Sequence, residues 1–301
     1  MKSIPWQIKL AFSILLLGLV AWKFPVSGII ECLKNANIAW VLLAFLLGEL
    51  IILNQAFRWN YLLLVPKEQK PKFASLLKYT AVGYLFNLFA PGGVGGDAYR
   101  SIALGKAHNV IASSVASVLA AKILGLVALC LLFWVALPHS EQIPGQAIWF
   151  MALGSLFLVA VCFCLAFNPF KKGRVGQFAE KLREYRKYPL RLVAAMLGSI
   201  LMQVLVVLMQ WAVFKALDIP VPWNLVFIIV PITVLLTTIP ISFNGIGVRE
   251  WSYLYLTAAC AIESELLLAS LLLSYAVIIL QALQGGLLLL CSRQGRPNIG
   301  V

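Results

Sequence analysis

The chain of 301 residues is too apolar for a water-soluble protein, since 62% of its residues are hydrophobic and 12% are charged, against about 45–50% and about 25% in soluble domains. Its net charge of +13 does not indicate a nucleic-acid partner, because the basic residues gather in short stretches between long apolar runs, as in the cytoplasmic loops of membrane proteins.

Six apolar runs are long enough to cross a hydrocarbon core of about 30 Å as helices with a rise of about 1.5 Å per residue. We expect these spans at 8–24, 38–64, 110–136, 147–167, 190–216 and 264–291. The first run resembles a signal peptide, but no small-residue cleavage site follows it. We therefore expect a retained span there.

Two further apolar segments, 74–106 and 223–261, are broken by glycine and proline. Lys and Arg mark cytoplasmic loops, and they are frequent in 65–73 and 168–191 but absent from 137–146. Both termini are therefore predicted to be cytoplasmic, so the first broken segment enters and leaves on the cytoplasmic side and the second on the opposite side. The predicted fold is an all-α integral membrane protein with about six full spans and two re-entrant hairpins.

The two broken segments share a sequence pattern. In each, an apolar half-helix ends at a proline (Pro91 or Pro240), a glycine follows five residues later (Gly96 or Gly245), and charged residues open the next segment. Such paired interruptions are typical of inverted-repeat transporters, whose substrate site lies near the bilayer midplane. The alternative is that each hairpin consists of two ordinary short spans joined by a turn.

The whole chain, 1–301, is accordingly predicted to be a single membrane domain. Its inverted repeats are 38–136 and 190–291, with an N-terminal span at 8–24 and a linking span at 147–167.

Irregular backbone at membrane depth predicts a cavity, because unpaired N–H and C=O groups are tolerated only where protein or water satisfies them. Helices that start after Gly96 and after Gly247 would direct free N–H groups and positive dipole ends toward such a cavity. Asp97 is the expected N-cap of the first of these helices. The two helix starts would together bind an anionic group such as a lipid phosphate.

The segment 87–97 with Arg100, and the segment 240–250, resemble the motifs of the lysylphosphatidylglycerol synthase transmembrane family, the membrane region of MprF-like proteins. The resemblance covers nearly the whole chain. It implies a membrane region that moves lipids, such as aminoacylated phosphatidylglycerol, between leaflets. The soluble aminoacyl-transferase domain of full-length synthases is not in this sequence, so we expect a transporter and not an enzyme.

Ionisable residues within membrane segments indicate functional sites. Arg100 and Arg249 are predicted to bind the lipid phosphate, since a guanidinium makes bidentate bonds to phosphate. Asp97 and Glu250 would hold these arginines or bind the amine of a cationic headgroup. The structural alternative is that Asp97 pairs with Arg249, or Arg100 with Glu250, only to neutralise buried charge.

Other polar residues within the spans each have two predicted roles or a structural one. Lys122, in the middle of its span, would serve the substrate or pair with Glu49, and Arg58 is expected to extend to the cytoplasmic interface. Gln203, Gln210, Gln281 and Gln284 would bond across helices or line a polar passage. The predicted substrate-binding residues are Glu49, Asn87, Pro91, Gly95, Gly96, Asp97, Arg100, Lys122, Asn244, Gly245, Gly247, Arg249 and Glu250.

The sequence as a whole predicts a lipid translocase in the cell inner (plasma) membrane that moves a phospholipid or another phosphate-bearing lipid between leaflets. We expect no metal, no cofactor and no nucleic acid, and a homo-oligomer stays open. The alternatives are a membrane-embedded transferase acting on a polyprenyl-phosphate-linked substrate and a lipid-binding membrane protein that does not transport.

Overall fold

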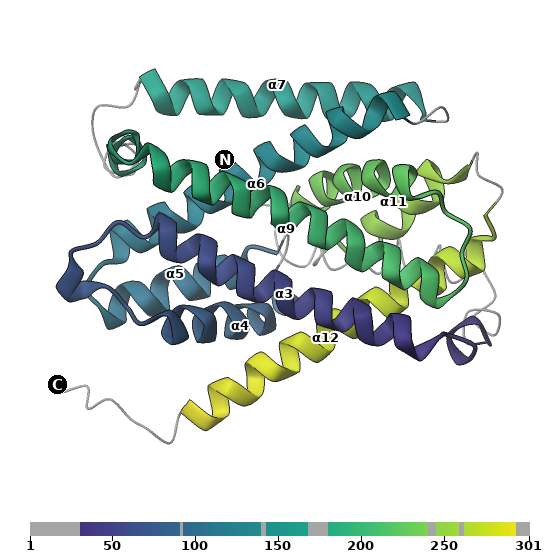
Figure 1. Ribbon diagram of the computed structural model, residues 1–301, viewed down its shortest axis with the longest axis horizontal. Coiled ribbons are helices and arrows are strands. Elements are labelled where there is room, and N and C mark those ends of the chain that lie inside the picture. The colour runs from purple at the N-terminus through teal and green to yellow at the C-terminus, as the bar shows by residue number, and fades with distance from the viewer. Residues whose placement is uncertain are drawn as a thin grey trace.

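The computed structural model of the protein describes residues 31–90, 93–139, 143–167, 180–239, 245–258 and 262–292. All regular elements in these ranges are helices, and they form one bundle (Figure 1). The predicted span 8–24 lies outside the described residues.

Nine α-helices of nine or more residues lie in the described ranges. The first four are α3 (Ile38–Leu62), α4 (Phe73–Phe89), α5 (Gly95–Ala107) and α6 (Ile111–Ala136). The next five are α7 (Gly145–Phe167), α9 (Pro189–Ala216), α10 (Trp223–Thr238), α11 (Val248–Leu256) and α12 (Ser264–Ser292). Short 3₁₀ turns lie at Lys67–Gln69, Leu137–His139 and Tyr185–Lys187.

Five helices of the described chain, α3, α6, α7, α9 and α12, are long and apolar enough to cross a membrane. They coincide with five of the six predicted spans to within a few residues. Their sequences support this length because they consist of long apolar runs with few charges.

The broken segments form pairs of shorter helices, also as predicted. Helices α4, α5, α10 and α11 have 17, 13, 16 and 9 residues, which gives lengths of about 26, 20, 24 and 14 Å. Each is shorter than the roughly 30 Å of a hydrocarbon core. Helices α4 and α10 both end two residues before a proline, where the residue that precedes proline disfavours helical backbone.

The two helix pairs lie at opposite ends of the bundle. Figure 1 shows α4 and α5 at one end and α10 and α11 at the other, with α3 and α9 side by side between them. Helix α4 packs on α12, and α10 packs on α6. Helix α7 lies at the edge of the bundle, where it contacts α6 and exposes large apolar side chains such as Trp149 and Phe157.

Glycine allows the closest helix contacts around the first pair. A Cβ added to Gly285 of α12 would lie 2.2 Å from the carbonyl oxygen of Ala81 in α4. A Cβ added to Gly96 of α5 would lie 2.4 Å from the carbonyl oxygen of Gly83 in α4. Helix α4 is therefore held in backbone contact with both neighbours, in the way that small residues allow in membrane helix packing.

Candidate functional site

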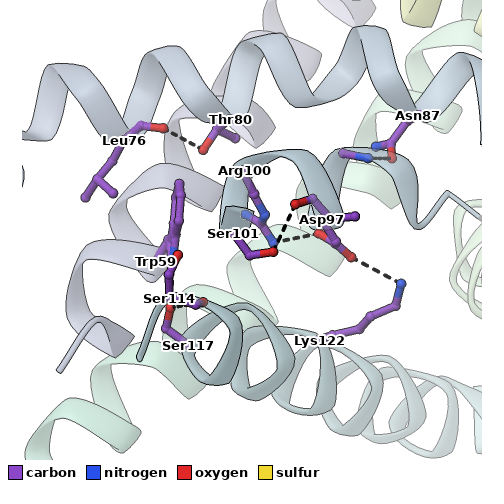
Figure 2. A network of polar contacts seen from close by, with 12 residues as sticks. Trp59, Leu76, Thr80, Asn87, Asp97, Arg100, Ser101, Ser114, Ser117 and Lys122 are labelled. Carbon is purple, nitrogen blue, oxygen red and sulfur yellow. Dashed lines mark hydrogen bonds and ion pairs between the residues drawn. The ribbon is translucent and has the colours of Figure 1, made fainter. Parts of the chain in front are cut away.

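Asp97 lies at the centre of a charged cluster at the start of α5 (Figure 2). One oxygen, Oδ1, accepts a bond from Arg100 Nη2 at 2.8 Å, and Oδ2 accepts one from Lys122 Nζ of α6 at 3.2 Å. Three predicted site residues are thus brought together. Lys122 pairs with Asp97, so the alternative in which it pairs with Glu49 is wrong. Asp97 is nearer because α5 and α6 pack against each other.

The side chain of Arg100 is 3% exposed and lies over an aromatic ring. Its guanidinium carbon is 5.3 Å from the centroid of the Trp59 ring in α3. The indole Nε1–H donates to Ser117 Oγ of α6 at 2.8 Å, which fixes the orientation of the ring. Arg100 is therefore positioned from three helices, by a carboxylate on one side and by a cation–π contact on the other.

Asn87 of α4 caps the start of α5. Its Oδ1 accepts the backbone N–H of Gly96 at 2.7 Å. The helix begins at Gly95, so Asp97 is its third residue and the predicted N-cap role for Asp97 is wrong. The carboxylate of Asp97 is instead used by the two cations. Gly96 is needed at this point, because a Cβ there would lie 2.8 Å from Asn87 Oδ1.

Arg58 of α3 is buried, at 4% exposure, and does not extend to the interface as expected. Its Nη1 donates to Ser199 Oγ of α9 at 3.1 Å. Asn54, one turn away, donates to the carbonyl oxygen of Gly198 at 2.8 Å. The prediction is wrong because α3 packs along α9, and α9 covers the face of α3 that carries Arg58.

The cluster carries more positive than negative charge. Arg58 lies within electrostatic range of Arg100 and Asp97, and in the described chain Asp97 is the one carboxylate that forms an ion pair with Arg100 or Lys122. Three guanidinium nitrogens, Arg58 Nε, Arg100 Nε and Arg100 Nη1, have no hydrogen-bond partner. An unpaired buried donor costs about 1–3 kcal/mol, and more when it is charged. The cluster is chemically suited to bind an anion.

The second hairpin turns through two glycines in the left-handed region. Gly245 has a φ of +78° and Gly247 a φ of +85°, a conformation that favours glycine. Helix α11 then begins at Val248, directly after Gly247 as predicted. Glu250 Oε2 accepts the backbone N–H of Gly247 at 2.6 Å, so this buried carboxylate caps its own helix.

The proposed ion pairs between the two hairpins do not form. Arg100 pairs with Asp97 and not with Glu250, and the guanidinium carbon of Arg249 lies 5.0 Å from the centroid of the Tyr275 ring in α12. Each hairpin therefore satisfies its acid locally. The pairing of Gly96 with Gly245 by spacing is also wrong, because Gly96 is inside α5 whereas Gly245 is in the turn before α11.

The remaining predicted residues have varied surroundings. Gly95 packs on α4, since an added Cβ would lie 2.3 Å from the Phe86 carbonyl oxygen. Glu49 lies beside Gln281 of α12. Pro91 and Asn244 lie outside the described residues.

Two glutamines bond across helices, as expected. Gln203 of α9 donates to the carbonyl oxygen of Gly125 in α6 at 2.9 Å. The amide oxygen of Gln210 accepts a bond from Ser274 Oγ of α12 at 3.1 Å. Gln284 is exposed and takes no part in this packing.

A cavity of about 190 Å³ lies between residues of both hairpins and the long helices α3, α9 and α12. Tyr84 of the first hairpin and Arg249 of the second both line it, together with Gln210, Thr233 and Gln281. Sequence reasoning singled out Arg249 but missed Tyr84 and Thr233. Thr233 is one of three threonines in α10 and Tyr84 is one of several aromatic residues in its segment, so neither residue stands out in the sequence.

Comparison of the sequence with known protein families identifies one matching family. The family model described as "Lysylphosphatidylglycerol synthase TM region" matches residues 6–285. No curated protein matches the chain. The match includes both pairs of short helices and the five long apolar helices of the described chain, except the C-terminal end of α12 after residue 285. The protein is therefore a multi-pass membrane protein that belongs to the family of lysylphosphatidylglycerol synthase transmembrane regions, with a function related to membrane lipids.

Proposed function

We propose that the protein is a lipid translocase that moves a phosphate-bearing lipid between the leaflets of the cell membrane. The observation that carries this proposal is the pairing of Arg100 and Lys122 with the single carboxylate of Asp97, with buried Arg58 within electrostatic range of both Arg100 and Asp97. The excess positive charge of this cluster and its unpaired guanidinium N–H groups suit a lipid phosphate, which accepts bidentate bonds from arginine.

The helix contacts support an inverted repeat. If α3, α4, α5 and α6 correspond to α9, α10, α11 and α12, the contact of α4 with α12 has its counterpart in the contact of α10 with α6. Asp97 and Glu250 are both the third residue of their helices. We therefore assign the two short helix pairs as re-entrant hairpins of a single membrane domain, entering from opposite faces of the bilayer.

The ion pairs of Asp97 suggest how a phosphate would be held and released. In the structure, Arg100 and Lys122 are bound to Asp97. An arriving phosphate replaces the carboxylate as the partner of one or both cations, and the carboxylate takes them back when the lipid leaves. Because the charge partners are exchanged, neither state buries three cations without an anion, and movement down a lipid gradient requires no other energy source.

The test is a flip assay with purified protein in liposomes that contain fluorescent phospholipids, with a membrane-impermeant quencher outside. Lys122→Gln removes one phosphate contact at a side chain that is 31% exposed, and we expect flipping to slow by about tenfold or more, the value of one charge-assisted hydrogen bond. Lys106→Gln changes an exposed residue of α5 and serves as the matched control. Wild-type flipping no faster than in empty liposomes would refute the proposal.

A further inference from the structure

The cavity beside Arg249 contains buried polar atoms without partners. Thr233 and Gln210 are 3% and 5% exposed, and neither Thr233 Oγ1 nor Gln210 Nε2 makes a hydrogen bond. Both residues line the cavity. Buried polar groups in proteins are nearly always bonded to protein or to a ligand or water, so these two atoms indicate an occupant with acceptor groups.

The donors are oriented by their neighbours. Ser274 of α12 holds the amide oxygen of Gln210, which leaves the Nε2 group as the unpaired end. The Tyr275 ring supports the guanidinium of Arg249. Among the described lining residues, Arg249 carries the one formal charge, and Glu49, beside Gln281, is not one of them. The cavity is thus lined by three hydrogen-bond donors, the Thr233 hydroxyl, the Gln210 amide and the Arg249 guanidinium. Such a set of donors favours the binding of an anion.

The size and the walls of the cavity suit a lipid phosphate. Its volume of about 190 Å³ is several times the roughly 10–15 Å³ that a single water needs on the same measure, so a phosphate group fits. Much of the remaining wall is apolar, with Ile51, Val206 and Ile278 among the lining residues.

We propose that this cavity is a second phosphate-binding site, built from Arg249, Gln210 and Thr233, for the phosphate of a lipid. The inference rests on the proposed function and extends it, since it gives the lipid a second binding position. Tyr84 lines this cavity and lies within electrostatic range of Arg100 and Asp97. The two phosphate sites are therefore neighbours.

Binding to the detergent-solubilised full-length protein tests the site without any requirement for transport. The probe is dihexanoylphosphatidate, and inorganic phosphate is measured separately. Thr233→Val keeps the side-chain volume but removes the hydroxyl, and Gln210→Met removes the amide donor. Because the cluster around Asp97 is proposed to bind the same lipid, two binding steps are expected in the wild type. We expect each variant to weaken one of these steps by about tenfold, as for the loss of one hydrogen bond to a charged group.

The matched controls are Thr238→Val on the same helix and Gln284→Met on the exposed face of α12, and both should bind phosphatidate as the wild type does. Binding by Thr233→Val and Gln210→Met that equals the controls would overturn the proposal. Inorganic phosphate that binds as tightly as phosphatidate would also overturn it, because the occupant would then be a free ion and not a lipid.

The outcomes separate this site from the translocase proposal. A wild type that binds phosphatidate in a manner sensitive to Thr233 and Gln210 but flips no lipid refutes transport and retains the site. A wild type that flips lipid, with both variants binding phosphatidate normally, retains transport and refutes the site.

Discussion

Replacing Asp97 with asparagine removes the negative charge from the cluster while it keeps the shape of the side chain. Removal of one partner from a buried ion pair costs about 3–5 kcal/mol, because the other charge is left uncompensated. Arg100 is 3% exposed, whereas the side chains of Asp97 and Lys122 are 20% and 31% exposed. Since water screens part of the interaction, we expect the low end of this range, about 3 kcal/mol.

Reversible unfolding in mixed detergent micelles, followed by tryptophan fluorescence, measures this free energy. Lys122→Met is the internal comparison, because it removes the more exposed cation and leaves the Asp97–Arg100 pair in place. We expect it to cost less than about 1 kcal/mol, as for a partly exposed ion pair. If Asp97→Asn cost no more than Lys122→Met, the account of Arg100 as a buried charge that depends on Asp97 would be refuted.

Three further changes are predicted from local geometry, all measured as the free energy of unfolding in the same micelles. Gly285→Ala should destabilise by about 1–3 kcal/mol through a clash with the α4 backbone, whereas Gly286→Ala, whose nearest atoms would be 3.8 Å away, should be neutral or slightly stabilising; equal effects would contradict the close contact. Asn87→Ala should cost about 1 kcal/mol through loss of the α5 cap, and an unchanged stability would show that the cap contributes nothing. Burial raises the pKa of Tyr185, so its hydroxyl remains a donor to the last carbonyl of α3, and Tyr185→Phe should cost about 1 kcal/mol at neutral pH, with no loss speaking against that bond.

The positions of the helices could be predicted from the sequence because the bilayer imposes a length on apolar segments. The span expected at 190–216 is observed at Pro189–Ala216, and that expected at 264–291 is observed at Ser264–Ser292. The breaks were predictable as well, since proline disfavours helical backbone before it and Gly247 permits a positive φ. Local chemistry therefore determined most of the element boundaries.

The partners of the charged residues could not be predicted in the same way. Asp97 meets Lys122 across 25 residues of sequence, and Arg58 is buried because α9 covers one face of α3. Both outcomes depend on which helices become neighbours, and hydropathy contains no such information. The N-cap was misplaced for the same reason, since the group that satisfies the start of α5 comes from Asn87 on another helix.

The bonds between α3 and α9 have a mechanical consequence. The side chains of Asn54 and Arg58 donate hydrogen bonds from α3 to Gly198 and Ser199 of α9. Sliding one helix along the other would break both bonds at once. Helices α3 and α9 should therefore move together as one rigid unit. Any conformational change in the bundle should occur in the short helices packed around this unit. Spin labels on the outer ends of α3 and α9 are then expected to keep one separation while labels on α4 and α10 change theirs.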